Sequence, residues 1–114
     1  LRNSQSSLER SQAVIQTYTI LESMRANRTA ALAGAYNLAQ TCDPPAANAT
    51  LAQSDMRAWI TSLEQTLGNT ANTCGTIVCN GADCTVTVQW DDSRATGNAG
   101  AGAANYRVAT RTQL

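Results

Sequence analysis

The first third of the chain carries apolar side chains at helical spacing. At 100° per residue, polar side chains form one continuous stripe, which comprises Gln5, Glu9, Gln12, Gln16, Thr19 and Ser23. Large apolar side chains occupy the opposite side, and these are Leu8, Val14, Ile15, Tyr18, Leu21 and Leu32. The pattern predicts one long amphipathic helix over residues 1–36, with its apolar side packed on a globular body.

The two halves of this helix differ in apolar content. Before residue 13 the only large apolar residues are Leu1 and Leu8, whereas Ile20 and Met24 widen the apolar side later. We therefore expect the second half to dock and the first half to project, with a sparse seam of Leu1, Leu8 and Ile15. A charge at Ile15, where the apolar side widens, should destabilise the fold, whereas a charge at Leu8 should not. No helix-start signal marks the first residues, so we expect the helix to continue upstream.

A second helical pattern covers residues 50–67. Thr50 and Gln53 form a capping-box pair at its start, and Gly68 follows its end. Apolar residues recur at helical spacing within it, and these are Met56, Trp59, Ile60, Leu63 and Leu67. Pro44 and Pro45 forbid a helix between the two patterns, so we expect a loop there. We place Trp59 in the core because it lies on the apolar side.

The hydrophobic period then changes from 3.6 to 2, which predicts strands near residues 76–79 and 84–91. A two-residue turn of type II′ at Gly81 and Ala82 would join them in a hairpin. This register places Cys79 opposite Cys84 where the strands approach most closely. It also places one apolar face of the hairpin toward the core, and that face comprises Cys79, Cys84, Val86, Val88 and Trp90.

Alternation returns near residues 105–112 and predicts a third strand at the edge of the sheet, with Tyr106 and Val108 inward and Arg107 and Arg111 outward. The stretch before it, residues 91–104, is rich in Ser, Thr, Asn, Gly and Ala and reads as a surface loop. The predicted fold class is α+β. A long N-terminal helix packs on a small antiparallel meander with a second short helix, in one domain over residues 1–114.

Four cysteines without any histidine favour disulfides and an exported, oxidising location. The hairpin register favours the pair Cys79–Cys84, which leaves Cys42–Cys74, although the other two connectivities remain open. The C-x4-C-x4-C spacing of Cys74, Cys79 and Cys84 differs from the tight pairs of zinc knuckles, so we expect no metal there.

Composition narrows the function classes. The eight arginines are scattered, lysine is absent and the net charge is zero, which argues against nucleic acid as a partner. The serines and threonines have no evident base to activate them, so we expect no catalytic residues and no cofactor. Asp91, Asp92, Ser93 and Asn98 could offer oxygen atoms to calcium, but they lack the ligand order of an EF-hand loop.

Several segments are similar to one bacterial family. The helix resembles it at residues 1–5, 10–13 and in Met24-Arg25-Ala26-Asn27-Arg28, and the resemblance resumes at residues 55–59 and in the Val-x-Val-x-Trp-Asp-x-x-Arg run of residues 86–94. These segments resemble minor pilins of the type IV pilus, of the PilV kind, the pilus modification proteins. The resemblance extends over about two thirds of the chain. One departure is that Cys84 lies 30 residues before the C-terminus, unlike the last cysteine of major pilins.

The resemblance implies assembly rather than catalysis. It implies an upstream hydrophobic helix that anchors the protein in the inner membrane, with the head in the periplasm, and later forms part of a cell-surface pilus. The implied partners are other minor pilins, the major pilin and the inner-membrane assembly machinery. Such a subunit would prime polymerisation and enter the fibre near its tip, with Leu1, Leu8 and Ile15 against neighbouring helices.

Two alternatives remain from the sequence. A minor pseudopilin of a type II secretion system shares the same plan of helix and sheet. An extracellular adhesin-like module would use the loop at residues 91–104 as its contact surface. Arg25 and Arg28 lie one helical turn apart and could form a partner-contact patch, or they could be helix-end charges that pair locally.

Overall fold

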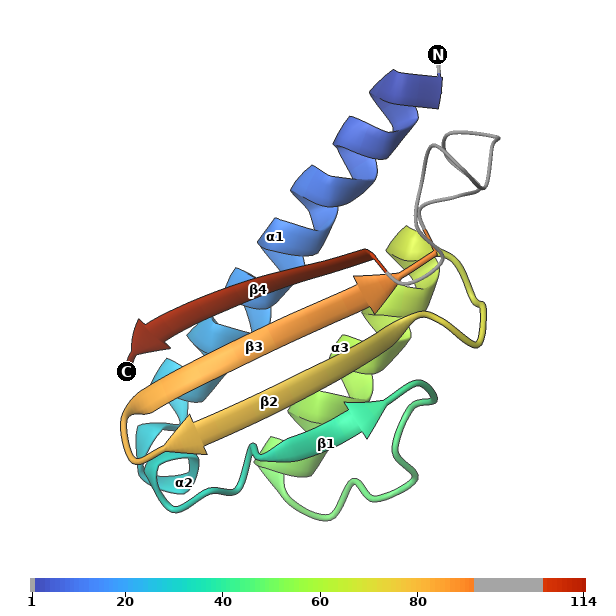
Figure 1. Cartoon of the computed structure of the whole chain (residues 1–114). Coiled ribbons are helices and arrows are strands. Elements are labelled where there is room, and N and C mark those ends of the chain that lie inside the picture. Colours follow the sequence, from blue (N-terminus) through green and yellow to red (C-terminus); the bar gives the residue numbers. More distant parts are fainter. Residues whose placement is uncertain (1, 92–105) are drawn as a thin grey trace.

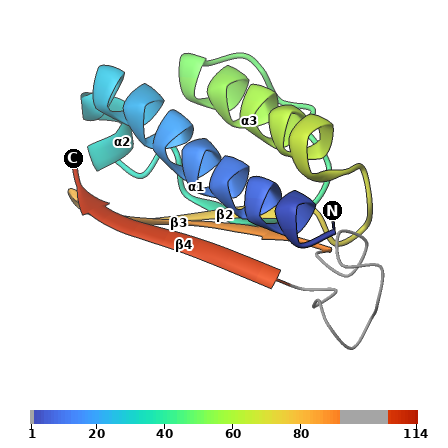
Figure 2. The same ribbon diagram turned by 90° about the horizontal axis from the view of Figure 1, so that it is seen from above.

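Two helices lie side by side on one face of an antiparallel sheet (Figures 1 and 2). The structure, a computed structural model, describes residues 2–91 and 106–114. The elements in chain order are α1 (Arg2–Ala26), α2 (Arg28–Leu32), β1 (Leu38–Thr41), α3 (Leu51–Leu67), β2 (Cys74–Asn80), β3 (Asp83–Trp90) and β4 (Tyr106–Gln113). The α+β class is therefore confirmed. The first turns of α1 extend past the edge of the sheet (Figure 1).

The long helix ends earlier than the sequence predicts. At Asn27 the backbone leaves the helical region (φ −123°, ψ 49°), and only the short α2 follows. The Asn27 amide donates a hydrogen bond to the Tyr36 hydroxyl (3.3 Å), and that hydroxyl donates to Asp55 Oδ2 on α3 (2.5 Å). Burial, together with the Asp55 hydrogen bond, raises the pKa of Tyr36 to about 12, so the hydroxyl stays protonated. This tertiary network replaces the last turns of the expected helix.

The sheet has the order β1-β2-β3-β4 and is antiparallel throughout the described residues. The hairpin register is confirmed, because Asn80 pairs with Asp83 and Cys79 with Cys84. Gly81 has a φ of +62°, and no described residue other than glycine has a positive φ, as a type II′ turn at Gly81 and Ala82 requires. The predicted C-terminal strand is β4, and it forms one edge of the sheet with Arg107 and Arg111 exposed.

The other edge strand, β1, lies just before the predicted loop, in a stretch where the sequence predicts no strand. Leu38 pairs with Ile77 and Thr41 with Gly75, with an irregular register between these pairs. Leu38 is the only large apolar residue in this four-residue strand, so no alternation marks it in the sequence. The strand therefore depends on its pairing with β2 and on the disulfide that follows it at Cys42, and not on an alternation of apolar and polar residues.

Both disulfides have the pairing that the hairpin register favours. Cys79–Cys84 closes the hairpin with a Cα–Cα distance of 4.1 Å. Cys42–Cys74 joins the chain just after β1 to the first residue of β2, and the Cα atoms lie 4.0 Å apart. The second bridge therefore closes the segment that contains α3, and it holds the short strand β1 at the sheet edge.

The helix α3 approaches β2 closely at Gly75. A Cβ atom added at Gly75 would lie 2.5 Å from Trp59 Cζ3 and 2.9 Å from Ile60 Cδ1, so only glycine admits the indole at this distance. Trp59 Nε1 also donates a hydrogen bond to the Gln16 carbonyl of α1 (3.0 Å). One side chain therefore joins α1, α3 and β2. Trp59 and Trp90 are both buried, as the sequence predicts.

We predict that Gly75→Ala destabilises the fold by about 1–3 kcal/mol, because the new methyl group overlaps the Trp59 ring. Denaturant unfolding would measure the loss. In the background of Trp59→Leu, which removes the ring, the same substitution should cost clearly less. Equal costs in the two backgrounds would show that the Gly75–Trp59 contact is not the cause.

We also predict that the two disulfides differ in their contribution. Replacing Cys42 and Cys74 by serine should lower the free energy of unfolding by about 3–4 kcal/mol, because that bridge spans 32 residues. Replacing Cys79 and Cys84 should lower it by about 2 kcal/mol, since that bridge spans 5 residues. Guanidinium unfolding of the two double variants would reveal the order, and the reverse order would contradict the chain-entropy argument.

Candidate functional site

The helix α1 buries only part of the apolar side that its pattern predicts, because Ile20, Leu21 and Met24 are buried as expected whereas other apolar residues are not. The residues of α1 that are buried comprise Glu9, Ala13, Gln16, Thr17, Ile20, Leu21 and Met24. Two members of the predicted water-facing stripe, Glu9 and Gln16, are thus inside. In contrast, Leu8 is 57% exposed, Ile15 60% and Tyr18 50%. The expectation that Ile15 is docked and that a charge there would be buried is therefore wrong.

Small and polar side chains explain this orientation of α1. Gln16 Nε2 donates to Ser62 Oγ of α3 (2.9 Å). Thr17 Oγ1 lies 2.8 Å from Thr110 Oγ1 of β4. Because buried polar groups that find partners cost little, these contacts allow α1 to lie close to both α3 and β4. The hydrogen bonds decide the orientation, and they cannot be read from hydrophobic periodicity.

Docking also reaches further toward the N-terminus than expected. The Arg10 guanidinium lies over the Tyr106 ring of β4, 4.3 Å from its centroid. Glu9 is 7% exposed, so the helix is already docked one turn before residue 13, where the expected division lies. The Arg10–Tyr106 pair is a cation–π contact, which stabilises partly exposed sites by about 0.5–1 kcal/mol.

The outer side of α1 carries a line of exposed apolar side chains. Leu8 and Ile15 lie seven residues apart and Tyr18 follows three residues later, so all three project from the same side of the helix. We call these three residues the exposed seam. Val14, at its margin, is 38% exposed. Tyr18 and Val14 were assigned to the buried side from the sequence. Leu8, Ile15 and Tyr18 are separated by seven and then three residues, a spacing typical of helices that pack against other helices. That spacing could have identified Tyr18 as an exposed contact residue.

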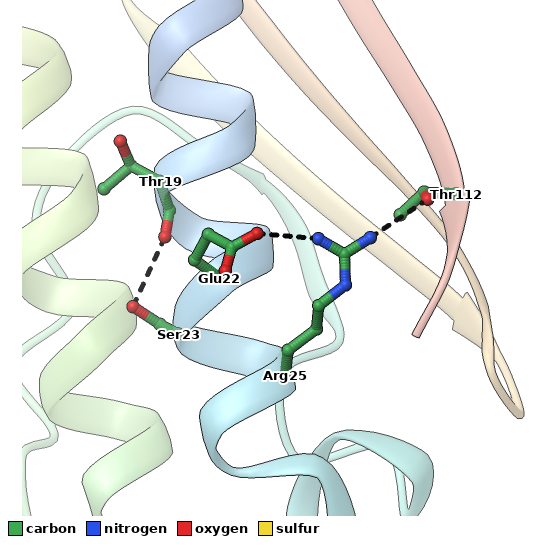
Figure 3. Close-up of polar contacts among 5 residues, drawn as sticks. All are labelled: Thr19, Glu22, Ser23, Arg25 and Thr112. Carbon is green, nitrogen blue, oxygen red and sulfur yellow. Dashed lines mark hydrogen bonds and ion pairs between the residues drawn. The ribbon is translucent and has the colours of Figure 1, made fainter.

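The candidate interface residues do not all lie together. Leu8 and Ile15 share the exposed seam, and Leu1 lies outside the described residues. Arg25 Nη1 contacts Glu22 Oε1 at 2.7 Å, and Arg25 Nη2 donates to Thr112 Oγ1 of β4 at 3.2 Å (Figure 3). Arg25 thus pairs locally, which agrees with the interpretation of Arg25 as a helix-end charge. Its hydrogen bond to Thr112 also links the end of α1 to β4. Arg28 is exposed at the start of α2.

Other candidate chemistry has no assembled site among the described residues. All four cysteines are in disulfides, and residues 2–91 and 106–114 contain no group of three or more His, Cys, Asp or Glu side chains placed to hold a metal ion. The calcium candidates at Asp92, Ser93 and Asn98, and nearly all of the loop at residues 91–104, lie outside the described residues. The expectations of no catalytic residues and no cofactor stay predictions.

Comparison of the chain with protein-family models, curated proteins and solved structures found no match. In the described part of the chain, no helix combines the length and the apolar character that crossing a bilayer needs.

We predict that two isoleucines on α1 respond differently to the same change. Ile20→Ala should lower the free energy of unfolding by about 2–5 kcal/mol, because Ile20 is only 1% exposed. Ile15→Ala should change it by no more than about 0.5 kcal/mol, since that side chain is 60% exposed. Thermal or denaturant unfolding of the two variants would decide. A large loss from Ile15→Ala would mean that the exposed seam is buried in the folded protein.

Proposed function

We propose that this chain is the head of a minor pilin, a structural subunit that primes assembly of a type IV pilus and enters the fibre. The observation that carries the proposal is the exposed seam, because it lies on the outer side of a long N-terminal helix whose other side is docked. The resemblance of Met24-Arg25-Ala26-Asn27-Arg28 and of residues 86–94 to minor pilins supports the same assignment.

In this proposal the exposed seam packs against helices of neighbouring subunits. Burying a large apolar side chain contributes about 1.5–3 kcal/mol, so Leu8, Ile15 and Tyr18 together could supply several kcal/mol to a subunit contact. Ser11 and Glu22 are exposed on the same side of the helix, so polar side chains interrupt the seam and limit its apolar area. A narrow seam fits an assembly in which each subunit shares its helix with several neighbours and no single contact is large.

The proposed location follows from the same assignment. The head would lie in the periplasm while the subunit waits in the inner membrane, and it would reach the cell surface within the pilus. Two disulfides in a chain of 114 residues are consistent with an oxidising compartment. The partners in this proposal are other minor pilins, the major pilin and the inner-membrane assembly machinery.

We predict that charges in the exposed seam block assembly without unfolding the head. The full-length protein with both Leu8→Asp and Ile15→Asp would be expressed in its source organism in place of the native copy. Filaments sheared from the cells should lack this variant, because carboxylates cannot be buried between helices without a partner. The measurement is the amount of the protein in the sheared fraction relative to the membrane fraction.

The matched control is Val78→Asp, since Val78 is 58% exposed on β2 and, next to the buried Ile77, lies on the sheet face that the helices leave bare. This variant should enter filaments as the native protein does. Thermal unfolding of both variants would verify that the heads fold. If the seam variant entered filaments normally, or if the native protein never occurred in them, the assignment as a pilus subunit would be wrong.

A further inference from the structure

The face of the sheet opposite the helices contains a polar hollow. The helices cover only one face of the sheet, as Figure 2 shows. On the other face, side chains of the strands line a hollow of about 260 Å³. Its lining comes from all four strands and consists of Gln40, Thr76, Thr87, Gln89 and Arg107. None of the lining side chains is acidic or apolar.

Strand register places these residues on the open face. Thr76 pairs with Thr87, and Gln89 pairs with Arg107 on the next strand. Their sequence neighbours on β2 and β3, such as Ile77 and Val88, point into the core, so the alternation of the strands turns the polar set outward. Because central strands hold most of the lining, the hollow has a rigid base.

The Arg107 guanidinium is held in a fixed orientation. Its Nε donates to Gln89 Oε1 at 2.8 Å, and Gln89 Nε2 donates to the Asn72 carbonyl at 3.3 Å. Gln89 is only 7% exposed, so it acts as a buried support for the arginine. Arg107 Nε is thus hydrogen-bonded to Gln89. Its two terminal nitrogens, Nη1 and Nη2, have no hydrogen-bond partner among the described residues. A guanidinium held in this way presents a planar pair of donors.

A second arginine on the same strand provides a comparison. Arg111 faces the same side of β4 four residues later, and it binds Asp83 through Nε at 3.0 Å and Nη2 at 2.6 Å. The hydrogen bonds from Arg111 lower the pKa of Asp83, so this pair stays ionised and mutually neutralised. Arg107 has no such acid within its hollow. The hollow therefore combines the positive charge of Arg107, which has no acidic partner among the described lining residues, with the hydroxyls of Thr76 and Thr87 and the amide of Gln40.

We propose that this hollow binds an oxyanion, the carboxylate or phosphate group of a polar ligand, with Arg107 as the bidentate donor. The guanidinium fork matches the geometry of both groups, and charge-assisted hydrogen bonds of this kind are the strong ones. Gln89 is the positioning residue, and Thr76, Thr87 and Gln40 offer hydrogen bonds to the remainder of the ligand. The shared chemistry can come from an acidic sugar or from a phosphate group.

The test is an NMR titration of the isotope-labelled chain with glucuronate, inorganic phosphate and, as a neutral control, glucose, at constant ionic strength. The Arg107 Nε–H signal and the backbone amides around Thr76 and Gln89 should shift in a saturable way with at least one of the two anions. The expected dissociation constant is on the order of 1 mM, as for a single bidentate contact. A response to glucuronate alone identifies an acidic sugar, and a response to phosphate alone identifies a phosphate group.

Two matched variants sharpen the test. Arg107→Gln should weaken binding about tenfold or more, because it removes both the charge and the fork. Arg111→Gln, on the same strand and face, should leave the affinity within about twofold, since Arg111 is already paired with Asp83. Shifts with neither anion, the same shifts with glucose, or equal weakening by the two variants would each overturn the proposal. The titration uses the isolated chain, so its outcome is independent of whether the protein enters a pilus.

Discussion

The contact between Trp59 and Gly75 determines how the helices lie on the sheet. The indole ring occupies the space that a side chain at residue 75 would fill, so α3 approaches β2 more closely than any other residue there would allow. From this position Trp59 Nε1 reaches the Gln16 carbonyl and fixes α1 beside α3. The remaining contacts of α1, such as Thr17 with Thr110, then follow at hydrogen-bonding distance. Losing the glycine would therefore disturb both helices and not only one strand.

This arrangement decides which side of α1 faces solvent. The side toward the body carries the small residues Ala13 and Thr17, both fully buried, where α1 lies close to α3 and β4. Larger apolar side chains, those of Ile20, Leu21 and Met24, are buried further along the helix. Gln16 lies inside because Ser62 binds its amide. The large side chains of Leu8, Ile15 and Tyr18 remain on the outer side. Exposed apolar side chains that form a line on a helix are typical of protein–protein contacts, whereas isolated ones need no explanation. The orientation of α1 is thus the link between the core and the proposed assembly function.

The parts of the fold that local patterns specify could be predicted, and the parts that tertiary contacts decide could not. The hairpin was predictable because turn chemistry, cysteine pairing and alternation all required one register, with Cys79 opposite Cys84. The second helix was predictable from its capping box at Thr50.

The helix break at Asn27 and the strand β1 depend on partners far along the chain, namely Tyr36 with Asp55 and the bridge Cys42–Cys74. The exposed seam was predictable only in part: the sparse seam expected from the sequence includes Leu8 and Ile15, but a charge at Ile15 was also expected to be buried, and Tyr18 was placed on the buried side. The hollow around Arg107 was missed, because it depends on cross-strand register between residues that carry no motif.

The two proposed surfaces lie on opposite sides of the molecule, and this separation has a consequence. The helices lie on one face of the sheet and leave the other face bare (Figure 2). The exposed seam lies on the side of α1 opposite its buried residues, and the residues that line the hollow lie on the bare sheet face. A subunit that packs its seam against other helices would turn the bare sheet face away from them. Arg107 would then remain accessible in the assembled state, and its ligand would bind to the outside of a fibre as readily as to the free head. The geometry therefore separates the surface proposed for assembly, on α1, from the site proposed for an oxyanion, on the sheet, so that the two proposed interactions need not compete.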